Sequence, residues 1–233
     1  MARLSDLVAR IGTVRELGEV FGALRALAAS HAQQADAAMA GITAYAAGVG
    51  RAMGTALGLV PPAAAPAERA LVIAFGAELG FCGAFDERVL QAVPDGALWT
   101  VGRRLTAHAT ERGHAVAASW PMATRPEAVL DVARRLAARL YEEAVPTPPR
   151  VTLLFTGPDG VEQLSLLPYD PAAFPGSGED PPLVQVDPAE LLARLVDEYV
   201  LAELARAAMA SFAAENAARL RTLQGRSTAS TTS

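Results

Sequence analysis

The chain has 233 residues, of which 52% are apolar and 19% are charged, so it can build a packed core together with extended helices, and disorder throughout is excluded. Its net charge of -5 argues against general binding to nucleic acid, because such binding depends on basic side chains that neutralise phosphates. All 20 basic residues are arginine, which excludes enzymes that need a P-loop lysine or a Schiff-base lysine.

Residues 1–60 predict one long N-terminal helix with the apolar spacing of a coiled coil. The first heptad row is Leu7, Val14, Phe21, Ala28, Ala35, Ile42, Val49 and Ala56, and a second row is Leu4, Ile11, Met39, Ala46 and Met53. In between, the stripe drifts to Leu17, Val20, Leu24 and Leu27, which predicts a local change of packing partner. A helix of this length measures roughly 80 Å, so part of it must project or bind partners.

The end of this helix has to be weighed against a membrane span. Residues 37–60 contain one charged residue, Arg51, and the small-residue spacing Gly50-x-x-x-Gly54-x-x-x-Gly58. The segment is rich in alanine and glycine but poor in leucine, and its apolar period continues from a charged segment upstream. We therefore expect a coiled coil and no direct membrane span. The N-terminal residues also lack the apolar run of a signal peptide.

Residues 68–182 predict an α/β domain, which begins after Pro61-Pro62 ends the first helix. Candidate strands alternate with helical stretches, the longest at 126–144, so we expect a doubly wound, mostly parallel sheet. These strands are Ala70–Phe75, Leu98–Gly102 and Val116–Trp120. A turn at 157–160 then joins two further strands, 150–156 and 163–167, into a hairpin that closes the sheet, and residues 170–182 form a surface loop.

A glycine-rich turn, Gly76–Gly83, follows the first strand at the place where phosphate-binding turns lie. Its spacing is not G-x-G-x-x-G, so we interpret Gly80, Cys82 and Gly83 as structural turn residues. Cys82 is a candidate thiolate nucleophile, but no histidine lies close to it in sequence, and a small buried cysteine is the simpler interpretation. The three histidines and the cysteine supply no ligand pair, so we expect neither a metal nor a cofactor.

Residues 187–224 predict a second long helix, which begins with an aspartate cap, Asp187, followed by Pro188 and by Glu190. Its apolar stripe needs a partner, and the N-terminal helix offers one in the antiparallel sense. The stripe consists of Leu192, Leu195, Tyr199, Ala202, Ala205, Met209, Phe212, Asn216, Leu220 and Leu223. Gly225 and the Ser/Thr-rich residues 225–233 are expected to end the helix in a disordered tail.

Four strings, taken in chain order, resemble the gamma subunit of F-type ATP synthases, the rotating central stalk. They are Arg10-Ile11-Gly12-Thr13-Val14, Ala26-Leu27-Ala28-Ala29-Ser30, Glu78-Leu79-Gly80-Phe81-Cys82-Gly83 and Ala214-Glu215-Asn216-Ala217-Ala218-Arg219-Leu220. They span nearly the whole chain, with one helix on each side of the α/β domain. On this resemblance the chain is identified as a shortened and divergent member of the family.

The resemblance implies an antiparallel coiled coil inside a ring of alpha and beta subunits, while the α/β domain meets the epsilon subunit and the membrane c-ring. Such a rotor couples proton or sodium movement to the catalytic ring, has no catalytic residues of its own and lies peripherally at the cytoplasmic face of the inner (plasma) membrane. The expected coiled-coil and subunit-interface residues are Leu7, Arg10, Ile11, Val14, Leu17, Val20, Phe21, Leu24, Leu27, Tyr199, Met209, Phe212, Glu215, Asn216, Arg219 and Leu220.

Departures from the family pattern keep two alternatives open, a non-rotating regulatory or scaffold protein derived from a gamma subunit and a small α/β enzyme that uses the glycine-rich turn. Basic residues of the family are replaced here by Glu19, His31, Gln33, Gln34 and Leu79. Residues 183–186 lack the tyrosines of the corresponding strand, and the last helix is expected to be shorter than in the family.

Overall fold

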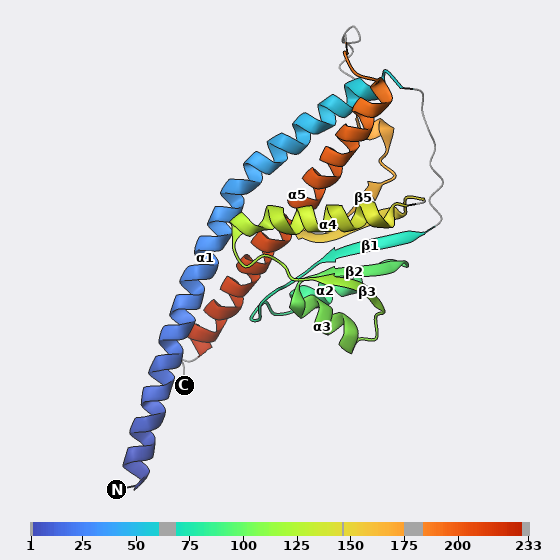
Figure 1. Ribbon diagram of the computed structural model, residues 1–233. Helices are drawn as coiled ribbons and strands as arrows, with labels where there is room; N and C mark the ends of the chain where they lie inside the picture. Colours follow the sequence, from blue (N-terminus) through green and yellow to red (C-terminus); the bar gives the residue numbers. More distant parts are fainter. Residues whose placement is uncertain (1, 61–68, 146, 175–183, 230–233) are drawn as a thin grey trace.

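Two long helices from opposite ends of the sequence lie side by side, and an α/β domain packs against them in the computed structural model (Figure 1). The structure describes residues 2–60, 69–145, 147–174 and 184–229, without the side chains of residues 2–11, 14 and 226–229. The helices are α1 (Ala2–Leu57), α2 (Phe85–Gln91), α3 (Arg103–Glu111), α4 (Val129–Glu143) and α5 (Pro188–Ala229), with short 3-10 turns η1 (Pro126–Ala128) and η2 (Pro171–Ala173). The strands are β1 (Ala70–Phe75), β2 (Ala97–Val101), β3 (Val116–Trp120), β4 (Arg150–Gly157) and β5 (Gly160–Leu167).

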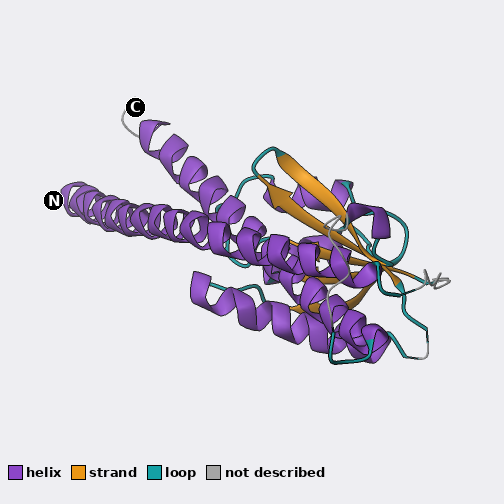
Figure 2. Cartoon of the chain, turned by 90° about the horizontal axis from the view of Figure 1, so that it is seen from above, coloured by secondary structure: helices purple, strands orange, loops and turns teal. Residues whose placement is uncertain are grey.

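The five strands form one sheet in the order β3-β2-β1-β4-β5. All neighbouring strands are parallel except β4 and β5, which form the antiparallel hairpin. The expected doubly wound, mostly parallel sheet is therefore confirmed. Side chains alternate between its faces, so that Leu71, Ile73 and Phe75 of β1 pack with α4 and α5, whereas Val72 and Ala74 pack with α2 and α3. Figure 2 shows helices on both sides of the strands.

Helices α1 and α5 run antiparallel along each other, as the apolar stripes predict. Of the first heptad row, Ala28, Ala35, Val49 and Ala56 are buried, and Met53 of the second row is completely buried. The α5 stripe is buried at Tyr199, Ala202, Ala205, Met209, Phe212, Asn216 and Leu223. The antiparallel packing of the two helices is therefore confirmed for the part of both whose side chains the structure describes.

Where the apolar stripe of α1 drifts, between Leu17 and Leu27, several of its side chains are exposed. Leu17, Val20 and Leu27 are 50%, 54% and 52% exposed, while Leu24 is half-buried. This stretch of α1 therefore leaves much of its apolar surface in contact with water. The side chains of Leu7, Arg10, Ile11 and Val14, also expected at the interface, lie outside the described residues.

Helix α5 differs from expectation at its C-terminal end. It continues through Gly225 to Ala229, so the expected stop at Gly225 is wrong, and residues 230–233 lie outside the described residues. A single glycine lowers helix stability by about 1 kcal/mol relative to alanine but does not prevent continuation of a helix that is already formed. Of residues 183–186, placed by the family resemblance at a strand, residues 184–186 form no strand here, and residue 183 lies outside the described residues. Within the described parts of the chain, no helix is sufficiently long and apolar to cross a bilayer.

The β2–α3 connection depends on Gly102, whose φ of +121° is one that other residues rarely adopt. A Cβ atom there would lie 2.7 Å from the carbonyl oxygens of both Gly76 and Ala77. We expect Gly102→Ala to lower the free energy of unfolding by more than about 1 kcal/mol. Urea unfolding followed by circular dichroism measures this loss. Gly80→Ala is the control, since a Cβ there meets no atom within 4 Å, and equal stability losses in the two variants would contradict the assignment.

Candidate functional site at the junction of α5 and the glycine-rich turn

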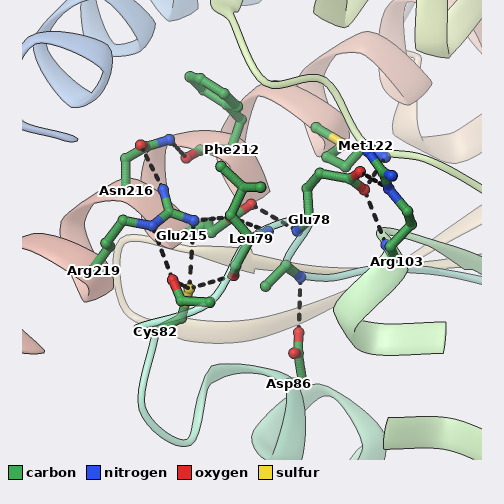
Figure 3. A network of polar contacts seen from close by, with 12 residues as sticks. Glu78, Leu79, Cys82, Asp86, Arg103, Met122, Phe212, Glu215, Asn216 and Arg219 are labelled. Atoms are coloured by element: carbon green, nitrogen blue, oxygen red, sulfur yellow. Dashed lines mark hydrogen bonds and ion pairs between the residues drawn. The ribbon is translucent and has the colours of Figure 1, made fainter. Parts of the chain in front are cut away.

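The glycine-rich turn after β1, residues 76–83, lies directly against α5 (Figure 3). Three polar residues of α5, spaced four apart, face the end of β1 and this turn: Ser211, Glu215 and Arg219. They are 1%, 2% and 6% exposed, and we call them the polar seam. Because residues four apart lie on one face of a helix, the seam forms a continuous row along α5.

Glu215 binds the turn through main-chain amides. Its carboxylate accepts hydrogen bonds from the amides of Glu78 and Leu79, each at 3.2 Å, and it also pairs with Arg219. Burial raises the pKa of the Glu215 carboxyl, and the Arg219 guanidinium and the two amides oppose that rise. The carboxylate therefore occupies a buried position in which every nearby donor stabilises its charged form.

Arg219 continues the contact one helical turn further along. Its Nε donates to the carbonyl of Gly80 at 3.0 Å, and its Nη1 donates to the side-chain oxygen of Asn216 at 2.9 Å. Its Nη2 reaches the sulfur of Cys82 at 3.6 Å as well as the Glu215 carboxylate. The planar guanidinium thus connects α5 to the middle and the end of the turn at once, a geometry that lysine cannot provide.

Ser211 connects α5 to the sheet itself. Its hydroxyl donates to the carbonyl of Phe75 at the end of β1, at 3.2 Å, and accepts from the amide of Thr156 in β4, at 3.4 Å. The polar seam therefore runs from the carboxyl end of β1 along the whole following turn. Its contacts fix the axial position of α5 against the α/β domain, because hydrogen bonds are directional and apolar contacts are not.

The turn is also anchored on its other side by Glu78, which is 4% exposed. Its carboxylate accepts from the amides of Arg103 and Met122, both at 2.9 Å, and pairs with the Arg103 guanidinium. Arg103 is the first residue of α3, so this carboxylate satisfies an amide at a helix N-terminus. One acidic side chain in the turn thus binds the segments that follow β2 and β3.

Asp86 in α2 completes the anchoring of the turn. Its carboxylate accepts from the amide of Ala77 at 2.7 Å and lies 3.3 Å from Nδ1 of His108 in α3. Burial raises the pKa of the Asp86 carboxyl, and the hydrogen bond from Ala77 and the charges of His108 and Arg104 oppose the rise. The residues of the turn are therefore held from three helices, α2, α3 and α5.

An apolar groove opens beside the polar seam, between α1, the turn, the segment 123–125 and α5, with a volume of about 510 Å³. Several large apolar side chains of the turn and of this part of α1 are exposed, and we call this set the apolar patch: Leu17, Val20, Leu27, Leu79 and Phe81. Of these, Leu27, Leu79 and Phe81 line the groove. Phe81 has a φ of +64°, unusual for a non-glycine residue, and its ring lies edge-on to Phe21 with centroids 5.9 Å apart. The turn and α1 are thereby in direct contact.

Of the residues expected at interfaces, the structure brings one group together around this groove: Leu24, Leu27, Phe212, Glu215, Asn216 and Arg219 line it. Phe212 also packs on the ring of His31, with centroids 5.7 Å apart. Tyr199 and Met209 are buried in the main core instead, and Leu220 is half-buried on α5. Gly83 has a positive φ of 59°, whereas Gly80 does not, so the backbone conformation favours glycine at the former only.

The sequence analysis did not single out the anchoring roles of Glu78, Asp86 and Ser211. For Glu78 a signal was present, since an acidic residue that follows a fully apolar strand must find donors if it is buried. Nothing in the sequence marked Ser211, because its partners are main-chain groups of β1 and β4 that lie far away along the chain.

Cys82 is buried, and its sulfur donates to the carbonyls of Leu79 and Gly80 at 3.2 and 3.3 Å. Burial, together with the negative charge of Glu215, raises the pKa of the thiol to about 12. This agrees with a small buried cysteine and disagrees with a thiolate nucleophile.

The raised pKa of Cys82 leads to a direct prediction. At pH 8 the buried thiol is therefore almost entirely un-ionised, and the thiolate is the reactive form. We expect labelling by a thiol reagent at pH 8 to be far slower in the folded chain than in urea, where the thiol is exposed. Absorbance at the reagent's leaving group measures the rate, with Cys82→Ser as the baseline. Equal rates in both conditions would show that the thiol is accessible.

The chain is thus a mixed α/β protein in which two long antiparallel helices are joined to an α/β domain through a buried polar seam. A protein-family model described as ATP synthase matches residues 3–230. The chain therefore belongs to the ATP synthase family of gamma subunits.

Solved structures with the same fold agree with this assignment. A chain of the central stalk and c-ring structure of the Tetrahymena thermophila mitochondrial ATP synthase matches with a TM-score of 0.61 and 14% identity, over 89% of this chain and 99% of that chain. A chain of the Euglena gracilis mitochondrial ATP synthase rotor matches with a TM-score of 0.50 and 13% identity, over 92% and 91%. Because both sequence identities are low, these similarities support the assignment of the fold alone. No curated protein sequence matches the chain significantly.

Proposed function

We propose that this chain is the central-stalk rotor subunit of an F-type ATP synthase, and that it couples rotation of a proton- or sodium-translocating c-ring to conformational change in the catalytic alpha/beta hexamer. The observation that carries the proposal is the polar seam, which fixes an α/β domain to a long antiparallel helix pair. A rotor needs such a joint, because torque applied to the domain has to reach the helices. The relatives of the same fold come from central-stalk and rotor assemblies.

In this function the helix pair lies within the alpha/beta ring, and the α/β domain with the adjoining ends of the helices meets the epsilon subunit and the c-ring. The faces of the pair differ, since α1 exposes Leu17, Val20 and Leu27 and also packs on α5. Rotation of an asymmetric shaft presents different faces to each beta subunit and thereby shifts its population among conformations. Bond making and breaking belong to the partners, and this chain contributes no catalytic residue.

As the rotor subunit of this complex, the chain would lie peripherally at the cytoplasmic face of the membrane that holds the c-ring. The exposed Leu17, Val20 and Leu27 of α1 then face the ring, where contact removes them from water. Glu19, Gln33 and Gln34 are exposed on the same helix and replace basic residues of the family, so contact in this region relies on apolar surface more than on ion pairs.

Co-purification tests the proposal directly. Affinity-tagged chain, expressed with its native alpha, beta, epsilon and c subunits, is expected to recover the complex with one copy per alpha/beta hexamer. Reconstituted into vesicles, this complex is expected to pump ions when ATP is added. Recovery without the hexamer would overturn the proposal, and recovery with the hexamer but without ATP-driven pumping would favour a non-rotating scaffold.

A further inference from the structure

Glu215 and Arg219 form a buried ion pair whose remaining hydrogen bonds are directed largely at the backbone of the glycine-rich turn (Figure 3). A second glutamate–arginine pair with the same spacing, Glu190 and Arg194, lies near the start of α5. The side chains of that pair are 56% and 76% exposed, against 3% and 8% for Glu215 and Arg219. Helix α5 therefore carries both the buried pair and an exposed pair of the same residue types and spacing, with which it can be compared.

Stability does not explain why the buried pair is charged. Removing two charges from water carries a desolvation cost, and well-packed apolar residues in place of a buried ion pair are often neutral or stabilising. What the charged pair adds is a set of directional hydrogen bonds to the backbone of the turn. Glu215 fixes the amides of residues 78 and 79, and Arg219 fixes the carbonyl of Gly80, so the turn is held in one position along α5.

Apolar packing alone would hold the turn less specifically. Leu79 and Phe81 of the turn are 48% and 41% exposed, so their side chains contribute little buried area on α5. Ala77, Cys82, Phe85 and Ala218 form a separate small cluster at this point, in which Phe85 is the only large side chain. The polar contacts therefore add a directional resistance to sliding between the turn and the helix that apolar packing does not provide.

We propose that Glu215 and Arg219 are positioning residues that make the α/β domain and the helix pair turn as one rigid body, so that the pair determines how tightly ATP hydrolysis is coupled to ion pumping. This inference rests on the proposed function. It adds a specific joint within the rotor through which torque passes from the domain to α5.

The test uses the assembled complex in vesicles. The double variant Glu215→Gln/Arg219→Met removes both charges and leaves neither partner as an unpaired buried ion. The matched control is Glu190→Gln/Arg194→Met on the same helix. We expect the ratio of ions pumped to ATP hydrolysed to fall at least threefold in the Glu215/Arg219 variant and to stay at the wild-type value in the control. An unchanged ratio in the assembled variant would overturn the proposal.

Hydrogen–deuterium exchange of the full chain provides a second readout, which also decides the case in which the variant does not assemble. Loss of the Glu215 acceptor is expected to speed exchange of the amides of residues 78 and 79, while those of α1 and α5 keep their protection. Loss of protection throughout both helices would instead show a general role in folding and would overturn the proposal. Failure of the wild-type chain to join a pumping complex is a separate result, which concerns the proposed function alone.

Discussion

Phe212→Asp is expected to separate α1 from α5 and to abolish assembly into a complex. The Phe212 side chain is 2% exposed, belongs to the main core and packs on His31 of α1. Truncation of a buried phenylalanine alone costs about 3 to 5 kcal/mol, and a buried carboxylate without a partner adds to that loss. Since the whole stability of a domain is about 5 to 15 kcal/mol, most of it is expected to disappear.

Urea unfolding followed by circular dichroism, together with co-purification of the alpha and beta subunits, measures this effect. Phe212→Leu is the control, because a smaller apolar side chain keeps most of the volume, and it is expected to cost less than about 1.5 kcal/mol and to retain assembly. If Phe212→Asp unfolded at the wild-type urea concentration, the ring would not have the buried position described above.

The sequence was most informative where a pattern repeats. The first heptad row of α1 predicts the buried positions Ala28, Ala35, Val49 and Ala56 correctly, because a helix that packs along one partner places every seventh residue in the same environment. Two other members of this row, Phe21 and Ile42, are only half-buried. The alternation of strands with helices likewise predicts the parallel sheet, since a parallel connection requires a crossover. Each of these patterns depends on periodicity within one segment or on the order of neighbouring segments.

The polar seam could not be predicted in the same way. The contacts of Glu215 with residues 78 and 79 join positions 136 or 137 residues apart, and they are made to main-chain amides, which carry no sequence signature. The apolar stripe of α5 predicts that Asn216 lies on the buried face of the helix, but it indicates no partner for Glu215 or Arg219. Physically, the location of a backbone donor follows from the fold of the whole domain, so it becomes visible only once α5 and β1 are placed together.

Leu27→Asp is expected to leave the chain folded and to prevent its stable binding to the alpha/beta ring. Leu27 is 52% exposed and forms part of the apolar patch, so an aspartate there remains in water and changes the stability of the isolated chain by only about 0.5 kcal/mol. Within the proposed complex the same carboxylate is buried against the ring. The loss of a central apolar contact and the burial of a charge together cost 2 kcal/mol or more, which corresponds to roughly 30-fold weaker binding.

The matched control for this variant is Leu130→Asp, because Leu130 is also an exposed leucine, at 40%, but lies on α4 outside the apolar patch. Titration of the purified alpha/beta ring against each variant measures the dissociation constants, and circular dichroism confirms that both variants are folded. Weaker binding of Leu27→Asp, together with unchanged binding of Leu130→Asp, would assign the binding surface to the exposed stretch of α1 around Leu27. Equal affinities would place the ring contact on another face of the helix pair, since a half-exposed leucine that contacts no partner tolerates a charge.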